Sequence, residues 1–521
     1  MSRTAPDSAA TSTRHPVRQY VDGILQVARG AVRSPWAGSA VVAGFAVQSA
    51  VLAVVLRRSI YDEDYHLGAI AYFAGGAGPF DEQPDTLRRL GDVERYGSYL
   101  YHVLLGVVWR MTAGLAPDHR VVVLRLVSVA MVAGALLVLR RLMLVLGMSG
   151  AATNVALLLV ASVPMLTFLA ASVNYDNLMI LAVCLLWLAV AEVWRGERDP
   201  WSAWARVLLW SGVACLAKFS AVPLVAGTVM VLLVRQVLVL RRGREPRPGA
   251  TRVAVITRGA WLLAAVVASV AVVERYGWNL VRYGTPLPDC IQVQDLQTCL
   301  SWGPWRRNYE LDGQFPDLSP GVPELVAYVT RDWIPSLSTT WTFFGAVVDG
   351  KVSGTLGAHV AGLLVVAASV AVVVLCLVGL RDVAALRGAV PLLVGCTLYV
   401  VALGGQNFSD YLRLGEPVGV QGRYLLPVAV VLIPFAVHAW AHLVRRQRLR
   451  SAPFVTALAV ALMISQGGGV IGVLARSDTT WFRPGGWEAV GTSVREVALT
   501  VVLDDALIPD PRRVVGTSAV P

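Results

Sequence analysis

Long apolar runs constrain the fold of this chain more than any other feature. A helix needs about 20 consecutive, mostly apolar residues to cross the hydrocarbon core of a bilayer. Only 15% of the 521 residues are charged and 56% are hydrophobic, too little charge to cover the surface of a soluble protein. The sequence therefore predicts an all-α integral membrane protein with about eleven transmembrane helices. The apolar runs are residues 37–56, 120–139, 151–170, 177–194, 203–217, 219–240, 254–273, 356–380, 388–404, 424–443 and 452–474.

The charge between these runs indicates how the chain crosses the membrane. The net charge of +11 comes from arginines in short connections, where basic residues mark the cytoplasmic side and not a nucleic-acid surface. We therefore expect a plasma-membrane protein with a cytoplasmic N-terminus, an outer C-terminus and no nucleic-acid partner. The basic connections that this orientation places inside are 140–150, 195–202, 241–253, 381–387 and 444–451.

One segment decides the register of this topology. Residues 98–116 are apolar enough to resemble a span, but a crossing there would move Arg140 and Arg141 to the outside. We interpret the segment as a helix that lies on the outer membrane surface. The expected parts are a basic cytoplasmic tail at 1–36, a transmembrane domain at 37–474 with outer loops at 57–119, 274–355 and 405–423, and an outer tail at 475–521.

The segment "YDEDYH" follows the first apolar run and carries Asp62, Glu63, Asp64 and His66. A single acid there would be an ordinary solvated loop residue. Three carboxylates and an imidazole within five residues are less expected, because charge at the interface loses part of its hydration. The pattern favours a general base that deprotonates a hydroxyl acceptor, and a ligand set for a divalent cation is the other functional interpretation.

Two further acidic segments lie on the predicted outer side. Glu94 lies between potential ion-pair partners, so an ordinary surface pair explains it as well as a site does. "NYDNL" places Asn174, Asp176 and Asn177 at a helix start, where one of them can cap the helix. Capping does not account for all three, and they could bind a sugar or a metal ion across an outer cavity from the first cluster.

Cations suited to phosphate lie on the same side. Lys218 is one of only two lysines in a chain that otherwise uses arginine, and it lies between two apolar stretches. Arg423 and Tyr424 begin a later apolar run in "VGVQGRYLLP". Anchoring at the membrane interface is the ordinary explanation for both cations. An ammonium and a guanidinium can also bind phosphate, the guanidinium with two parallel hydrogen bonds.

The outer loop 274–355 is rich in tryptophan and arginine, among them Arg282. Interfacial anchoring explains much of this composition, but tryptophan also stacks on sugar rings and arginine pairs with phosphate. Cys290 and Cys299 share this loop and can form a disulfide in an oxidising compartment. The sequence contains no Walker or HExxH pattern, which leaves nucleotide-driven transport and metalloprotease chemistry without support.

These motifs resemble glycosyltransferase superfamily C, whose members use polyprenyl-phosphate sugars. The resemblance rests on an acidic pair after the first helix, a surface-lying helix in the first outer loop and a second acidic site after the third helix. The chain resembles more closely a bacterial family of multi-pass membrane proteins, and this similarity covers about residues 40–445. The motifs are "DEDYH", "NYDNL", "AKFSAVPL", "VRYGTPL", "TTWTFFG" and "GVQGRYLLP".

The resemblance implies an inverting transfer of a sugar from a polyprenyl-phosphate donor to an envelope glycan or glycolipid acceptor. Asp62 would be the base, with Glu63 or Glu94 assisting. Asp176 would help to hold the acceptor or a metal, while Lys218 and Arg423 would neutralise the donor phosphate. The run of three acids departs from the usual single pair, so which of Asp62, Glu63 and Asp64 is the base stays open. "NYDN" is not a two-acid signature, so no cofactor is expected, with a divalent metal ion as the open alternative.

Two other classes of function remain open. A transporter or flippase for a lipid-linked envelope precursor would show paired halves, interrupted helices and ionisable residues at mid-membrane depth. The polar motifs instead gather on one side and no internal repeat is visible, which favours the enzyme. A non-catalytic scaffold for envelope assembly is the third interpretation.

Overall fold

The computed structural model describes most of the chain between residues 30 and 447. The described ranges are 30–57 except 31, 62–79, 97–196, 199–241, 252–342 except 316, 317 and 319, 346–348, 351–353 and 356–447, with isolated positions at 489, 492, 493 and 496. The expected span at 452–474, Glu94 and nearly all of both expected tails lie outside these residues.

Seven described helices are long and apolar enough to cross a membrane. A helix pair, α7 (Gly150–Ala161) and α8 (Pro164–Ala170), bends by 68° and brings the number to eight if the pair counts as one span. The chain is thus an all-helical membrane protein with seven or eight candidate spans in its described part. The seven are Ala37–Val55, Pro117–Leu146, Asp176–Arg195, Ala221–Arg241, Arg258–Tyr283, Ala389–Leu414 and Gly422–Arg445.

Three of the eleven expected spans are not among these eight, and the composition of the segment accounts for one of them. The segment 203–217 lies in α10 (Pro200–Ala217), which has 18 residues but carries Arg206, two serines and three tryptophans. The segment 356–380 corresponds to α19 (Leu356–Val378), which has 23 residues, and the side chains of residues 356–365 lie outside the described part of the chain. The third, 452–474, lies outside the described residues.

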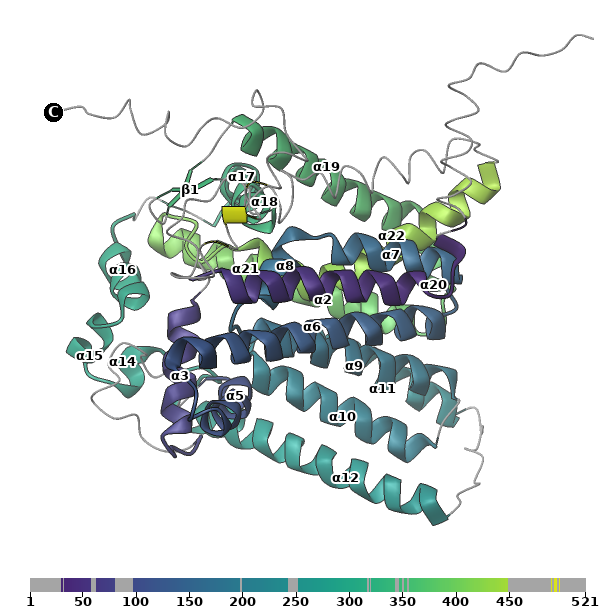
Figure 1. Cartoon of the computed structure of the whole chain (residues 1–521), viewed down its shortest axis with the longest axis horizontal. Helices are drawn as coiled ribbons and strands as arrows, with labels where there is room; N and C mark the ends of the chain where they lie inside the picture. Colours follow the sequence, from purple (N-terminus) through teal and green to yellow (C-terminus); the bar gives the residue numbers. More distant parts are fainter. Residues whose placement is uncertain are drawn as a thin grey trace, which may run out of the picture.

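The helices that contain the seven spans carry the labels of Figure 1. They are α2 (Ala37–Val55), α6 (Pro117–Leu146), α9 (Asp176–Arg195), α11 (Ala221–Arg241), α12 (Arg252–Val272), α21 (Ala389–Leu414) and α22 (Leu426–Gln447). The span of α12 continues through a π-helical turn, Val273–Gly277, into α13 (Trp278–Tyr283), and that of α22 begins with a 3-10 turn, Gly422–Leu425.

Shorter elements complete the described chain. They are α3 (Glu63–Ala74), α5 (Leu100–Met111), α14 (Cys290–Val293), α15 (Leu296–Leu300), α16 (Gly303–Leu311), α17 (Val322–Tyr328), a π-helical turn Val329–Trp333, α18 (Ile334–Thr342) and α20 (Leu380–Ala384). Two strands, β1 (Ala346–Val348) and β2 (Lys351–Ser353), pair antiparallel with Ala346 opposite Ser353.

The long helices lie side by side, and the short helices gather at their ends (Figure 1). Along one side of the bundle α6 packs on α9, α9 on α10 and α10 on α12. Helices α3 and α5 pack on each other at one end, near α14, α15 and α16, and α20 lies at the opposite end. With 12 residues, α5 is about 18 Å long, too short to cross a bilayer on its own.

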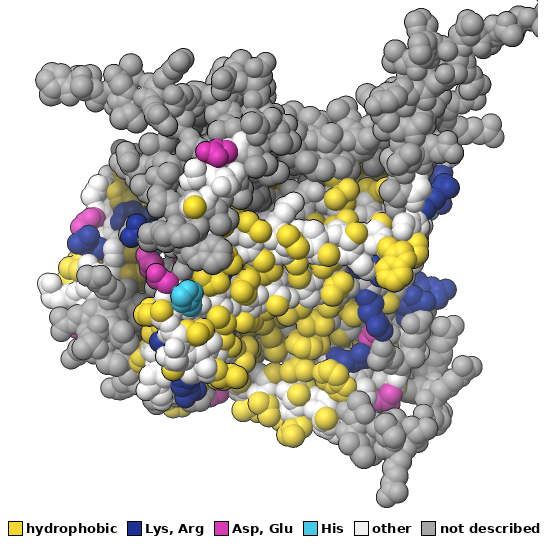
Figure 2. Space-filling model, in the orientation of Figure 1, with side chains coloured by type: hydrophobic (Ala, Val, Ile, Leu, Met, Phe, Trp, Pro, Cys, Tyr) yellow, Lys and Arg dark blue, Asp and Glu magenta, His cyan; other side chains and the backbone are white. Residues whose placement is uncertain are grey.

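The surface of the bundle matches a bilayer. Figure 2 shows a broad band of hydrophobic side chains over the long helices, with Lys and Arg side chains gathered at the end where α20 lies. Lipid cannot hydrogen-bond to exposed backbone, so helices that satisfy their own N–H and C=O groups are the structures suited to this band. The hydrophobic band over the long helices thus separates the two ends of the bundle.

Small residues allow two of the spans to approach closely. A Cβ atom on Gly395 of α21 would overlap the Thr228 hydroxyl and lie 2.8 Å from the Leu224 carbonyl oxygen of α11. A Cβ atom on Gly227 would lie 3.1 Å from the Gly395 Cα. Close backbone approach at glycine is a common way for helices to associate where lipid supplies no hydrophobic driving force.

We expect Gly395→Ala to lower the free energy of unfolding by about 1–3 kcal/mol, because overpacking must push α11 and α21 apart. Thermal unfolding of the purified protein in detergent measures the effect. Gly405→Ala, in the same helix, is the matched control, since a Cβ atom there meets nothing within 4 Å. Equal melting temperatures for the two variants would contradict the prediction.

Candidate functional site

Arg423 reaches the first acidic segment from the far end of the sequence. Its Nη2 donates to Oδ2 of Asp62 at 2.5 Å, across 361 positions of the chain. The Arg423 side chain is 1% exposed, whereas the Asp62 side chain is 58% exposed. Asp62 immediately precedes α3 and is the one described non-glycine residue with positive φ, at 47°. The pair therefore joins a buried cation to a carboxylate that faces solvent.

The turn before Arg423 is fixed by a close backbone approach. A Cβ atom on Gly422 would overlap the Leu337 carbonyl oxygen and lie 2.6 Å from the Trp341 nitrogen of α18. The Gly422 N–H also donates to the Thr340 hydroxyl at 2.5 Å. Glycine at this position thus lets the turn pack against α18, and it places the guanidinium at the end of the bundle.

A second ion pair joins the start of α9 to the end of α10. Lys218 Nζ donates to Oδ1 of Asp176 at 2.6 Å, and both side chains are buried. The ammonium lies over two aromatic rings, 4.7 Å from the centroid of Tyr175 and 4.3 Å from that of Tyr424. Burial alone would lower the pKa of Lys218, but Asp176 beside it raises that pKa above its usual value. Lys218 is therefore charged at neutral pH.

The two ion pairs form one group, which we call the charge cluster: Asp62, Asp176, Lys218 and Arg423. Arg423 Nε lies 3.9 Å from Oδ2 of Asp176, so the guanidinium faces both carboxylates. The cluster holds two positive and two negative charges, and Asp62 is its most exposed member. The sequence predicted all four as site residues, and the structure brings them together.

Glu63 lies next to Asp62 but faces away from solvent. Arg125 binds both of its carboxylate oxygens, with Nε to Oε1 at 2.8 Å, and the Val173 N–H donates to Oε1 at 2.8 Å. Arg125 also donates to the carbonyl oxygens of Ala53 and Leu56 at the end of α2. With its oxygens engaged in this way, Glu63 joins the start of α3 to α6 and to the segment before α9.

Arg125 is a residue that the sequence prediction missed. It lies in the long apolar helix α6 and is only 1% exposed. An ionisable residue inside a membrane span is costly and faces a partner within the bundle. That signal was available in the sequence, but nothing in the sequence identified Glu63 as the partner.

His66 forms a buried pair with His102 of α5. Nδ1 of His66 lies 2.9 Å from Nε2 of His102, so one ring donates a proton and the other accepts it. The His66 ring centroid lies 4.7 Å from that of Tyr175, which also contacts Lys218. Burial lowers the pKa of His102 to about 3. Burial, followed by His102, Arg423 and Lys218, also lowers the pKa of His66, so both rings are neutral at pH 7.

The asparagines of "NYDN" support the loop around Asp176. The Asn174 side-chain oxygen accepts from the Asp176 N–H at 2.9 Å. The Asn177 amide donates to the carbonyl oxygens of Leu169 and Ser172, near the end of α8. These contacts engage two of the four side-chain amide atoms, and among the described residues the other two, Asn174 Nδ2 and Asn177 Oδ1, are buried without a hydrogen-bond partner.

Two other predicted site residues are exposed, and two cysteines are paired. Asp64 is exposed on α3, and Arg282 is exposed on α13, with its guanidinium 5.3 Å from the Tyr283 ring. Cys290 and Cys299 are joined by a disulfide in the α14–α15 segment. Among the described residues, His, Cys, Asp and Glu form no group of three that could hold a metal ion.

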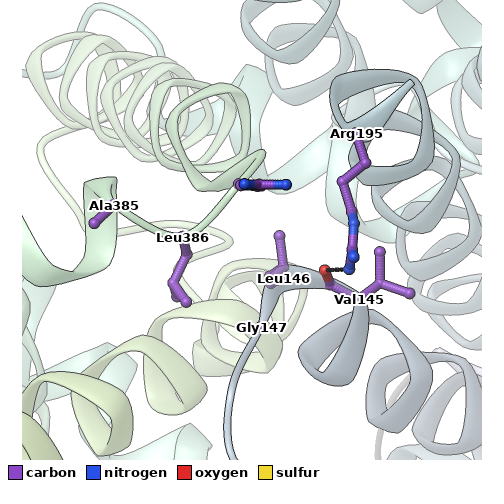
Figure 3. A pocket seen from close by; sticks show the side chains of 7 residues that line it. Val145, Leu146, Gly147, Arg195, Ala385 and Leu386 are labelled. Carbon is purple, nitrogen blue, oxygen red and sulfur yellow. Dashed lines mark hydrogen bonds between the residues drawn. The ribbon is translucent and has the colours of Figure 1, made fainter. Parts of the chain in front are cut away.

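A pocket of about 290 Å³ lies at the opposite end of the bundle. It is lined by the end of α6, by Arg195 at the end of α9 and by the connection from α20 to α21, including Leu386 and Arg387. Figure 3 shows Arg195 turned toward the Val145 carbonyl oxygen, to which it donates at 2.5 Å. Among the described residues, those that line this pocket include Arg195 and Arg387 and no carboxylate.

We expect Glu63→Gln to lower the free energy of unfolding by about 3–5 kcal/mol, because it leaves Arg125 as a buried charge without a counter-ion. Thermal unfolding in detergent measures the loss. Glu310→Gln is the matched control, since Glu310 pairs with Arg306 at 3.9 Å on the surface, where ion pairs contribute little. A Glu63→Gln protein as stable as the control would show that the buried pair does not hold α3.

The histidine pair predicts a pH dependence of stability. An unfolded histidine takes up a proton below its ordinary pKa of about 6.5, but the folded pair resists protonation because its pKa values are lowered. Protons therefore favour the unfolded chain, and stability falls as pH drops from about 6.5 toward 3. Between pH 7 and pH 5 we expect a loss of about 2 kcal/mol per histidine.

Melting temperatures of the wild type and of a His66→Phe, His102→Phe double variant, recorded from pH 7 to pH 5, measure this effect. The double variant should lose most of the pH dependence. The exposed His119, changed to Gln, is the control and should keep it. A double variant that retains the full slope would rule out the pair as its source.

Comparison with solved structures gives distant similarities. The archaeal oligosaccharyltransferase AglB from Archaeoglobus fulgidus, in complex with an inhibitory peptide and a dolichol-phosphate, has a TM-score of 0.40 and 14% identity. The match covers 84% of this chain and 55% of that one. The same organism's oligosaccharyltransferase, tethered to an acceptor peptide, has a TM-score of 0.39 and 13% identity over 84% and 54% of the two chains. The present chain thus spans about half the length of these proteins.

A search of the curated proteins gives no match. The family described as "Predicted membrane protein (DUF2142)" matches residues 55–432. This range contains the whole charge cluster, the Glu63–Arg125 pair and the histidine pair. The sequence motifs predicted a family of bacterial multi-pass membrane proteins, and the membrane-protein family is confirmed. The chain belongs to the DUF2142 family of membrane proteins.

Proposed function

We propose that this protein is a membrane glycosyltransferase that moves a sugar from a polyprenyl-phosphate donor to a hydroxyl of an envelope glycan or glycolipid. The charge cluster is the observation that carries the proposal. It combines a solvent-exposed carboxylate, Asp62, with two buried cations, Lys218 and Arg423, at one end of a membrane bundle. A base and a phosphate site side by side are what transfer from a lipid phosphate requires.

Asp62 acts as the general base in this reaction. It takes the proton of the acceptor hydroxyl as the hydroxyl oxygen attacks the anomeric carbon of the sugar. The bond between that carbon and the phosphate oxygen breaks, and polyprenyl phosphate leaves with the bonding electron pair. A single displacement of this kind inverts the configuration at the anomeric carbon.

Lys218 and Arg423 stabilise the leaving phosphate. Negative charge grows on the phosphate as the glycosidic bond breaks, and preorganised cations are most useful where charge develops. Lys218 is held by Asp176 and by the rings of Tyr175 and Tyr424, so it needs little reorganisation to meet that charge. The guanidinium of Arg423 adds a planar pair of donors suited to phosphate oxygens.

The neighbours of the cluster position these groups. The Glu63–Arg125 pair fixes the first turn of α3 directly after Asp62. We place this end of the bundle at the outer membrane face, because described basic residues such as Arg195 and Arg387 lie at the other end and basic residues favour the cytoplasm. In this orientation α5 lies on the outer surface, the donor enters from the outer leaflet and the acceptor from the envelope. The arrangement needs no metal ion.

We expect Asp62→Asn to reduce transfer at least 100-fold, since positioned general bases contribute about 10²–10⁴-fold. The purified protein is incubated with a panel of polyprenyl-phosphate sugars and membrane glycolipid acceptors, and release of polyprenyl phosphate is measured. Asp312→Asn is the matched control, because Asp312 also pairs with an arginine, Arg413 at 3.6 Å, but outside the cluster. Full activity of Asp62→Asn would refute the assignment of the base.

A flippase for a lipid-linked precursor is the second candidate. The bend of 68° between α7 and α8 favours it, because transporters bind substrates at interrupted helices. The two proposals differ in their products. A flippase moves the intact lipid-linked sugar across reconstituted vesicles, whereas the enzyme releases polyprenyl phosphate.

A further inference from the structure

The Asp62–Arg423 contact has a consequence that rests on the proposed function. We propose that Arg423 holds Asp62 in the substrate-free protein, and that the donor phosphate displaces Asp62 from Arg423. The carboxylate then becomes available to the acceptor hydroxyl only after the donor has bound. Phosphate and base thus compete for one guanidinium, and binding of the first releases the second.

The charge balance of the cluster requires such an exchange. Two carboxylates already neutralise Lys218 and Arg423, so a bound donor phosphate adds negative charge to a neutral set. While Arg423 Nη2 donates to Asp62, that hydrogen bond is not available to a phosphate, and the Asp62 carboxylate repels the incoming anion. One carboxylate must therefore move away as the phosphate arrives.

Asp62 is the carboxylate that can leave. Its side chain is exposed, so water can replace the guanidinium as its partner. Asp176 is buried, is bound by Lys218 and begins the long helix α9, so its release would leave a charge without water or a counter-ion. Asp62 also has a left-handed backbone conformation, which is unfavourable for a residue with a Cβ atom and which a shift of this residue can relax.

Arg423 stays neutralised during the exchange. Its Nε lies 3.9 Å from Oδ2 of Asp176, so the guanidinium keeps one carboxylate neighbour after Asp62 has gone. The side of the guanidinium that Nη2 now turns to Asp62 then faces the phosphate. The buried cation thereby exchanges one anion for another and is never left alone, which removes the main cost of breaking a buried pair.

Binding of polyprenyl phosphate, the proposed leaving group, tests the competition directly. The dissociation constant is measured for the detergent-purified wild type and for Asp62→Asn. If Asp62 competes with phosphate for Arg423, then Asp62→Asn should bind the probe about 10-fold more tightly, or about 1.4 kcal/mol. If Asp62 instead only holds Arg423 in place for phosphate, the variant should bind the probe more weakly.

Two further variants make the result specific. Asp62→Gly also lacks the carboxylate and suits the left-handed conformation, so it should show the same tighter binding of the probe. It also keeps the test usable if the asparagine variant does not fold. In an Arg423→Gln background, Asp62→Asn should no longer tighten binding, because the shared partner is gone. A tightening that persists in that background reflects the general removal of negative charge and overturns the inference.

The outcomes separate this inference from the proposed function. Wild-type binding of polyprenyl phosphate combined with unchanged or weaker binding in both Asp62 variants overturns the competition and leaves the phosphate site standing. A wild-type protein that shows no saturable binding of the probe, even at high concentration, overturns the phosphate site and the competition together. Tighter binding in a variant that has lost sugar transfer supports both.

Discussion

A guanidinium buried at the end of a membrane helix cannot remain without counter-charge, and this constraint organises the candidate site. Arg423 is 1% exposed and lies at the start of α22, far from the N-terminal helices in sequence. It faces Asp62 before α3 and Asp176 at the start of α9. Breaking such a set by removing one partner leaves a desolvated charge, so the three elements are tied together by electrostatics as well as by packing.

The Glu63–Arg125 pair connects the start of α3 to α2, to α6 and to the segment before α9. Its arginine also binds the last carbonyl groups of α2, and its carboxylate accepts the Val173 N–H just before α9. Four segments of the chain therefore meet at one buried ion pair. Asp62 and Glu63 are adjacent in sequence but have different surroundings. The first turn of α3 directs the Asp62 carboxylate to solvent and the Glu63 carboxylate into the bundle.

The sequence predicted the polar residues of the site but not their pairing. Polar groups at the ends of apolar runs are conspicuous, which made Asp62, Asp176, Lys218 and Arg423 visible without a structure. Arg125 was missed because a lone arginine within a span shows that a partner exists without showing which one. Seven or eight of the eleven expected spans are found among the described residues, and α10 is not one of them because it mixes apolar residues with Arg206 and several tryptophans between α9 and α12.

The neutral histidine pair completes the electrostatic argument. His66 lies against Tyr175, whose ring contacts Lys218, so a proton on His66 would place a third positive charge beside the cluster. Burial, His102 and the two cations of the cluster together lower the pKa of His66 and prevent this. The neutral imidazole therefore adds no third positive charge to the two cations of the cluster at neutral pH. Under the proposed competition, the donor phosphate then meets only Lys218 and Arg423 as cations, and Asp62, the exposed carboxylate, is the group that it displaces.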